Sequence, residues 1–93
     1  MKSEKRQNVF ADLGFPDGEA ENLRIRADMM SELIEFVRKN KFTQARAAKA
    51  LGVTQPRVSD LMRGQIHRFS IDNLVTLLAA AGLRVDVRFK KVA

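Results

Sequence analysis

The 93-residue chain contains no cysteine and only one histidine. Without cysteine it can form neither a disulfide nor a thiolate metal site, so its stability must come from packing or from a partner chain. His67 has no companion ligands in the sequence, and we interpret it as a loop residue or a neighbour of a phosphate. Because no paired nucleophile and base is present either, we expect neither an enzyme nor a bound cofactor or metal.

Long hydrophobic runs are also missing. No segment approaches the apolar length of a membrane span, and the first ten residues, MKSEKRQNVF, lack the hydrophobic run of a signal peptide. A chain of this size hides only about 60 to 70% of its unfolded surface, which allows a single modest core. We therefore expect a cytoplasmic protein that does not bind membranes.

Acidic residues are scarce in the middle of the chain. Residues 38–68 hold eight Lys or Arg against the single acid Asp60, which gives this segment a net charge of +7. Residues 1–37 hold five against eight (−3) and residues 69–93 hold four against two (+2), which recovers the net charge of +6. A basic stretch is ordinarily just a solvated face. Here it coincides with the motif described below, and neutralisation of phosphates is the main sequence-independent source of DNA affinity.

The first third of the chain predicts a docking segment followed by the longest helix. Residues 1–18 form the N-terminal tail or docking segment, in which residues 9–15 are a short strand or an extended stretch and residues 16–18 break the chain. From about Glu19 to Asn40, apolar residues recur at three- and four-residue steps. This spacing predicts a helix that forms one wall of the core with Leu23, Met30, Leu33, Ile34 and Val37.

Three further helix starts share one local pattern, a hydroxyl side chain that can cap the helix, preceded by an apolar residue that can pack on its next turn. The pattern predicts helices that begin after Thr43, Thr54 and Ser70. Pro56 falls in the first turn of the second of these, where its missing N–H costs little. The last helix ends before Gly82, and its predicted inward residues are Ile71, Leu74, Val75, Leu78 and Ala81.

Residues 83–93 follow a different period. Charged and apolar residues alternate in RVDVRF, which predicts a half-buried strand. Because a lone strand cannot satisfy its backbone, it must pair with residues 9–13, with the same strand of a second copy, or with an edge of another protein. We favour the second copy, so the predicted dimerisation residues are Arg84, Val85, Asp86, Val87, Arg88 and Phe89.

The stretch from Thr43 to Met62 predicts a helix-turn-helix, within a mainly α-helical domain of four to five helices that spans residues 19–82. Each of its two helices has one apolar face, and the small residues Ala48 and Gly52 are expected to let the helices approach closely. An ordinary helical hairpin explains this packing equally well, but it does not explain the basic charge or the polar outer face. In a helix-turn-helix, the second helix lies in the major groove and the first crosses the backbone.

The outer surface of this motif supplies the predicted DNA contacts. Gln55 suits a bidentate contact with adenine, Arg57 or Arg63 can reach guanine or phosphate, and Ser59 can bond either. Asp60, also predicted to face outward, is expected to accept from cytosine or to pair with Arg57 or Arg63. Phosphate contacts are expected from the first helix and the later loop. The predicted DNA-binding residues are Thr43, Gln44, Arg46, Lys49, Thr54, Gln55, Pro56, Arg57, Ser59, Arg63 and Arg68.

The stretch from Gln44 to Leu61 resembles the lambda-repressor-like helix-turn-helix of the XRE family. The matching positions are Gln44, Ala48, Gly52, Val58 and Leu61. The lead-in NVFADLGFPDGEAENLRIRADMM, the segment RGQIHRFSIDNL and the terminal strand resemble a narrower branch, the HigA-like antitoxin regulators. The resemblance implies a dimer that represses its own operon and often binds a RelE-like or HigB-like ribonuclease toxin. It also places Gln44, Gln55, Arg57 and Ser59 at operator-contact positions, whereas Pro56 departs from the usual polar residue and leaves at most an apolar contact.

Two functions are therefore expected. The first is a homodimeric transcriptional repressor that binds a palindromic operator in double-stranded DNA. The second is an antitoxin whose main task is to neutralise a toxin, because the acidic first third of the chain can cover a basic ribonuclease.

Overall fold

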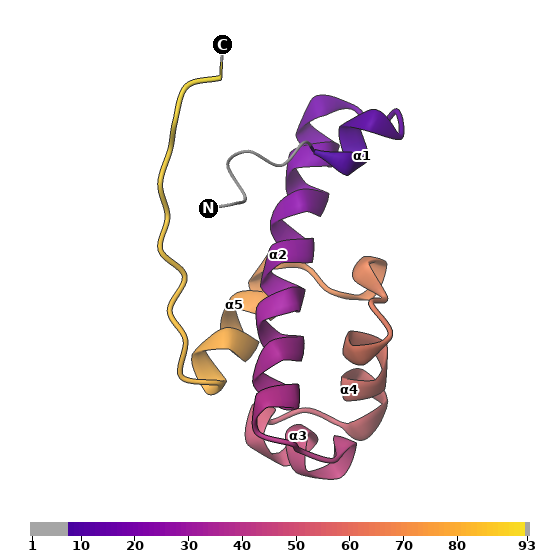
Figure 1. Ribbon diagram of the computed structural model, residues 1–93, viewed down its shortest axis with the longest axis vertical. Helices are drawn as coiled ribbons and strands as arrows, with labels where there is room; N and C mark the ends of the chain where they lie inside the picture. The colour runs from indigo at the N-terminus through magenta and orange to yellow at the C-terminus, as the bar shows by residue number, and fades with distance from the viewer. Residues whose placement is uncertain (1–7, 93) are drawn as a thin grey trace.

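The long helix α2 (Asp17–Lys39) organises the molecule, and the other helices pack along it (Figure 1). This computed structural model describes residues 8–92, so residues 1–7 of the predicted N-terminal tail or docking segment lie outside the described part. One end of α2 carries α1 (Val9–Asp12), and α3 (Gln44–Leu51) and α4 (Gln55–Met62) follow its far end. A 3₁₀ turn, η1 (Ile66–Arg68), leads to α5 (Ile71–Ala80), which lies against α2.

The predicted wall of the core is confirmed in α2. Leu23, Met30, Leu33 and Val37 are buried, whereas Ile34 is only partly buried. The helix begins two residues before its predicted start because Asp17 and Gly18 belong to its first turn, after Pro16 at the N-cap. Its ends match the helix dipole, with acidic residues in the first turn and Arg38 and Lys39 in the last.

The three predicted hydroxyl caps are confirmed. The Oγ1 atom of Thr43 accepts from the backbone N–H of Arg46 at 3.1 Å, and Thr54 caps α4 in the same way. Ser70 forms a reciprocal capping box with Asn73, since each side chain accepts from the other residue's backbone N–H. Short local signals of this kind suffice because a cap is decided within one turn.

The predicted inner face of α5 is partly wrong. Leu74 and Leu78 are buried and Ile71 packs at the edge of the core, but Val75 is 43% exposed, and Leu77, which was not predicted, is buried. The helix meets α2 and the end of α3 together, so the width of its buried face depends on where those two helices lie. The core as a whole comprises Ala20, Leu23, Met29, Met30, Leu33, Val37, Ala47, Ala48, Leu51, Val58, Leu61, Phe69, Leu74, Leu77 and Leu78.

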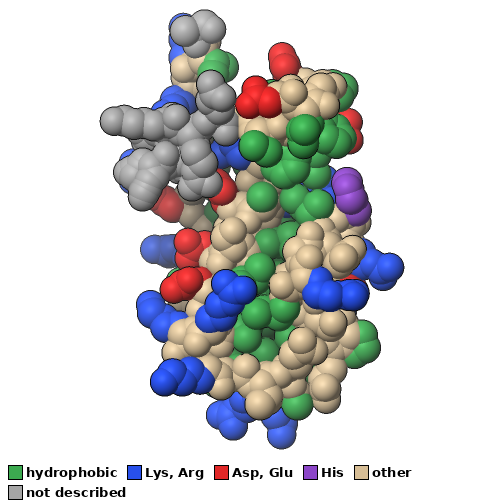
Figure 2. All heavy atoms as spheres, turned by 45° about the vertical axis from the view of Figure 1, so that its right-hand side comes forward, with side chains coloured by type: hydrophobic (Ala, Val, Ile, Leu, Met, Phe, Trp, Pro, Cys, Tyr) green, Lys and Arg blue, Asp and Glu red, His purple; other side chains and the backbone are tan. Residues whose placement is uncertain are grey.

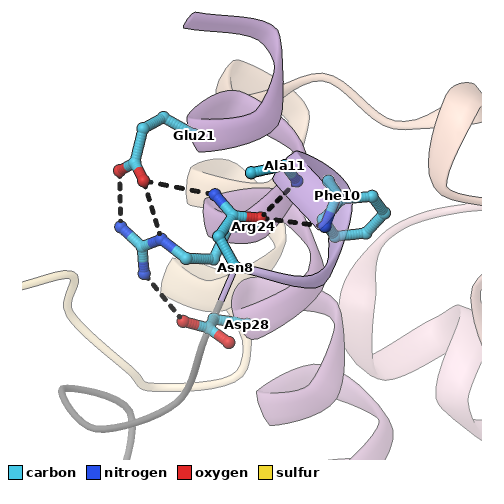
Figure 3. Close-up of polar contacts among 6 residues, drawn as sticks. All are labelled: Asn8, Phe10, Ala11, Glu21, Arg24 and Asp28. Carbon is cyan, nitrogen blue, oxygen red and sulfur yellow. Dashed lines mark hydrogen bonds and ion pairs between the residues drawn. The ribbon is translucent and has the colours of Figure 1, made fainter. Parts of the chain in front are cut away.

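Residues 9–15 form neither the predicted strand nor an extended segment, because residues 9–12 are the helix α1. The side-chain oxygen of Asn8 accepts from the backbone N–H groups of Phe10 and Ala11, which caps the helix. The amide of Asn8 donates to Glu21 at 3.3 Å, and Glu21 in turn is held by Arg24 at 2.9 Å (Figure 3). Asn8 is thus both the cap of α1 and its link to α2, a dual role that no periodic pattern signals.

The predicted strand at residues 84–89 is also wrong for the single chain. No strand is formed anywhere in residues 8–92, and after α5 the chain continues as an open trace beside the helices (Figure 1). A strand requires a hydrogen-bonded neighbour, and the alternating segment has none among the described residues. None of the helices in this part of the chain combines the length and apolar character that a membrane crossing requires.

Candidate nucleic-acid interface

Helices α3 and α4 pack on each other through small and branched side chains. Ala47, Ala48 and Val58 form a buried cluster with Val37 at the end of α2, and Phe42 and Val53 cover its edge as the predicted apolar partners of the caps. Alanine at the contact lets the two helices approach closely. The packing therefore presents the opposite side of α4, with the exposed residues of α3, as a continuous outer surface.

Gly52 in the turn has a different role from the one predicted. A Cβ atom built on it meets nothing within 4 Å, so a larger side chain would not push the helices apart. Its φ of 71° lies in the left-handed region, where its N–H closes α3 by bonding to the carbonyl of Lys49. The turn requires glycine for its backbone conformation, because an L-residue with a Cβ is strained there.

The basic side chains gather on this part of the molecule. Figure 2 shows lysine and arginine side chains mainly over the half that carries α3 and α4, and acidic side chains mainly toward the half that carries α1. The only acid between residues 38 and 68 is Asp60. The surface is therefore suited to a polyanion.

Most of the predicted contact residues do lie at the surface. Gln44 and Gln55 occupy the same position in their helices, directly after the caps Thr43 and Thr54, and both are exposed. The two threonine hydroxyls are occupied as caps. Ser59 is half-buried, and the other exposed residues of the predicted set are Arg46, Lys49, Pro56, Arg63 and Arg68. Among these, Arg46 lies over the ring of Phe42 at 5.5 Å.

Arg57 is not placed as predicted. Its guanidinium lies 4.1 Å from the centre of the Phe69 ring and donates to the backbone carbonyl of Arg68 and to the side-chain oxygen of Asn73. Asn73 is the same residue that closes the cap of α5. Arg57 therefore joins α4 to the start of α5, and each of its two terminal nitrogens donates a hydrogen bond within the protein.

Asp60 does not project from the outer surface. Its side chain is only 15% exposed, and its two oxygens lie 3.3 Å from Arg63 and 3.8 Å from Arg68. The predicted pairing with Arg63 is thus present, the partner Arg57 is not used, and Arg68 was not anticipated. The one acid in the basic segment is neutralised by cations on either side of it, which removes the expected conflict with phosphate.

Arg26 is a structural residue that sequence reasoning missed. From α2 it donates to the carbonyl oxygens of Ile66 (3.0 Å) and Phe69 (3.2 Å), which fixes the loop between α4 and α5. Together with Arg57 it holds the backbone that carries Arg68. Arg26 and the loop also line an open pocket of about 460 Å³. An arginine that bonds backbone 40 residues away leaves no local signal in the sequence.

His67, interpreted from the sequence as a loop residue or a neighbour of a phosphate, lies in η1 between α4 and α5 and is exposed. Within the described part of the chain, no three His, Cys, Asp or Glu side chains gather where they would hold a metal ion.

A family model described as a helix-turn-helix domain matches residues 9–90, which include α1 to α5. A solved structure described as an XRE-family transcriptional regulator has 31% sequence identity and a TM-score of 0.73, and the match covers 80% of this chain and 83% of that chain. No curated protein matches the chain. Both matches extend well beyond the two helices of the motif, so they concern the whole domain.

Proposed function

This chain belongs to the helix-turn-helix domain family, with an XRE-type DNA-binding regulator fold, and from that premise we propose that it is a homodimeric transcriptional repressor. It binds a palindromic operator and regulates its own operon, as a member of the HigA-like branch. The observation that carries the proposal is the coincidence of the basic segment, net +7, with the exposed face of α3 and α4. The basic residues, the helix-turn-helix and the exposed polar side chains therefore belong to the same part of the molecule.

Within this proposal, α4 enters the major groove and α3 lies over the backbone. Gln55 reads a base edge, supported by Ser59, and Pro56 offers an apolar contact such as one with a thymine methyl group. Gln44, Arg46, Lys49, Arg63 and Arg68 face phosphates, which position the protein without reading sequence. Thr43 and Thr54 contribute by orienting the helix N-termini toward the DNA, since their own hydroxyls are used in capping.

The dimer carries two such surfaces, with half-sites about one helical turn (~34 Å) apart. Residues 84–89 join the two copies, because this segment is exposed and its alternating apolar side chains contact no strand in the described chain. The operator is then expected to have the same two-fold symmetry as the protein.

Mobility-shift and footprinting assays on the promoter of the chain's own gene test the repressor function. The expected result is protection of two symmetric half-sites, with an affinity at least about 10³-fold above that for unrelated DNA. Binding that is weak and indifferent to sequence would contradict the operator.

A second candidate function is that of an antitoxin that neutralises a RelE-like or HigB-like ribonuclease. It is supported by the end of the molecule opposite to α3, where Val9 (55%) and Leu13 (71%) are exposed beside acidic residues. Exposed apolar side chains on an end of the molecule that also carries several carboxylates suit a basic protein partner. The acidic residues at this end are Asp12, Asp17, Glu19 and Glu21.

Co-expression with the product of the adjacent gene tests this second function. If the two proteins co-purify, Leu13→Asp should abolish the complex while leaving operator binding intact, because Leu13 lies outside the basic surface. Ile25→Asp, which alters an exposed apolar residue of α2, is the matched control. A complex that survives Leu13→Asp would place the partner elsewhere.

A further inference from the structure

The segment after α5 exposes an unusual amount of apolar surface. Val87 is 65% exposed, Phe89 93% and Val92 90%, in a molecule whose helices otherwise bury most of their large apolar side chains. Between the apolar residues lie charged ones, and Asp86 and Arg88 form an ion pair at 3.5 Å. That contact shows the two charges on one side of the segment, as alternation requires.

We propose that residues 84–90 of two copies pair as an antiparallel ribbon whose two-fold axis passes through Val87. This inference rests on the proposed homodimer and goes beyond it by stating the pairing register. In this register Val87 faces the partner's Val87, Val85 faces the partner's Phe89, and Asp86 faces the partner's Arg88.

The charges select among the possible registers, because residues directly opposite each other lie on the same face. An axis at Asp86 sets that carboxylate against its own copy and Arg84 against the partner's Arg88, so every charged pair is repulsive. An axis at Arg88 opposes two arginines at its centre; it sets Asp86 against the partner's Lys90, but it also puts Val85 opposite Lys91 and Arg84 opposite Val92, which mixes apolar and charged residues on each face. Axes at Val85 and at Val87 each form two attractive pairs, between Asp86 and an arginine of the partner.

The end of α5 decides between these two. Gly82 has a φ of 82°, and the N–H of Leu83 bonds to the carbonyl of Leu78 at 2.8 Å, so both residues belong to the helix cap. Extended pairing can therefore begin only at Arg84. An axis at Val85 would leave Phe89 opposite Ala81, which lies in the cap, whereas an axis at Val87 pairs the whole alternating stretch. The like charges Arg84 and Lys90 then meet only at the ends of the ribbon.

A two-stranded ribbon is marginal by itself, so its apolar face must also be covered. Leu83 (40%), directly before the segment, and Val75 (43%), in the middle of α5, are exposed. The ribbon face formed by Val85, Val87 and Phe89 packs on these residues in the dimer.

Disulfide trapping in this cysteine-free chain tests the register. Single cysteines are placed at each position from 84 to 90, and Ser31→Cys, on the exposed side of α2, reports random collisions. Directly opposite Cα atoms lie about 4.5 to 5.5 Å apart, within the range of a disulfide. Val87→Cys is expected to form covalent dimers at least about tenfold faster than any other single variant. Val85→Cys mixed with Phe89→Cys is expected to cross-link faster than either alone.

A charge exchange gives a second readout that does not depend on oxidation. Asp86→Arg should weaken the dimer about tenfold in sedimentation equilibrium, since two attractive pairs become repulsive. Adding Arg88→Asp should restore it only if these two positions face each other across the axis. An axis at Val85 predicts no rescue, because the partner of position 86 would then be Arg84.

The possible results separate this inference from the repressor function. Fastest trapping at another position, or failure of the rescue, overturns the register while a dimer that protects two half-sites keeps the proposed function. A chain that stays monomeric and binds DNA as a monomer overturns the ribbon and the dimer, but not DNA binding. Fastest trapping at Val87 together with rescue supports the inference.

Discussion

At the scale of single residues, the polar side chains of α4 differ in whether they are exposed or bonded within the protein. Gln55 is exposed at the start of α4, whereas Arg57, two residues later, is occupied by Phe69, Arg68 and Asn73. A side chain whose donors are already bonded must break those bonds before it can read a base. We infer that base recognition depends on Gln55, and that Arg57 positions α4 relative to α5.

Gln55→Ala is predicted to relax base preference at one position of each half-site. A bidentate contact with the right base contributes about 1 to 3 kcal/mol of discrimination, so affinities for operators that differ at that base should converge. The matched control is Gln44→Ala, at the same position of α3, which should weaken all sequences alike. The measurement is a binding titration against a set of single-base operator variants. An unchanged base preference in the Gln55 variant would show that Gln55 does not read a base.

Arg57→Lys is predicted to destabilise the fold without altering base preference. Lysine keeps the charge but loses the stacking of the guanidinium on the Phe69 ring and the simultaneous hydrogen bonds to Arg68 and Asn73. This loss should lower the free energy of unfolding by about 1 to 2 kcal/mol. Arg63→Lys, on the exposed end of α4, should leave stability nearly unchanged. Thermal unfolding and the same operator set distinguish the outcomes. A shifted base preference with unchanged stability would return Arg57 to the contact surface.

At the scale of secondary-structure elements, helix boundaries are controlled by a few backbone and capping groups. Thr43, Thr54 and Ser70 each satisfy an orphan N–H in the first turn, and Gly52 closes α3 in the left-handed region. Elements as short as the eight-residue α3 and α4 have too few internal bonds to persist alone. Their orientation on α2 therefore depends on these ends as much as on the apolar contacts.

Gly52→Ala and Gly18→Ala are predicted to change stability in opposite directions. Neither new Cβ meets an atom within 4 Å, so the difference is one of backbone conformation alone. The first should cost about 1 to 2 kcal/mol, because φ is 71° there. The second lies in the first turn of α2 and should gain about 0.5 to 1 kcal/mol. Denaturant unfolding measures both changes in the free energy of unfolding. A loss of equal size at both sites would indicate that the added Cβ atoms clash with their surroundings.

The link between α1 and α2 predicts a pH dependence. The hydrogen bond from Arg24, opposed by partial burial, holds the pKa of the Glu21 carboxyl below its ordinary value of 4.5. A depressed folded-state pKa contributes stability above the unfolded value, and this contribution is lost as the pH falls through the folded pKa. Glu21→Gln should therefore reduce the loss of stability on acidification below about pH 4.5, by a small amount because the site is exposed. Stability that falls equally with pH in both proteins would contradict this.

At the scale of the whole molecule, charge is separated along the fold. The acidic residues lie mainly toward α1, whereas the basic ones gather around α3 and α4 (Figure 2). Such a separation orients the protein as it approaches a polyanion and accelerates encounter at low salt. The basic side chains around α3 and α4 and the acidic end with α1 therefore lie on different halves of the molecule.

The salt dependence of DNA binding is predicted to identify which cations meet phosphate. Log affinity falls with log salt by about 0.9 for each phosphate neutralised, so Lys49→Ala should reduce the slope by about 1 on any sequence. Arg24→Gln removes the same charge from the acidic third and should leave the slope unchanged. Equal slopes for the Lys49 variant and the unaltered chain would place Lys49 outside the DNA contact.

The sequence by itself determined the starts of α3, α4 and α5, the helix-turn-helix, and the basic charge of that segment. These features depend on neighbours within one helical turn or on helical spacing. The capping threonines and Pro56 are signals of the first kind, and the apolar residues of α2 are a signal of the second. The segment of residues 9–15 was misassigned because the cap that makes it helical, Asn8, owes part of its position to Glu21 on another helix.

Only the tertiary structure decided which polar side chains are available. Arg57, Asp60 and Arg26 are placed by partners on other elements, and Gly52 is required for its torsion angle rather than for space. Residues 84–89 also show that a local pattern is not sufficient. Their alternation predicts a strand, but a strand forms only where a second backbone supplies its hydrogen bonds. Local signals determine elements, whereas contacts between distant parts of the chain determine what each exposed group can still bind.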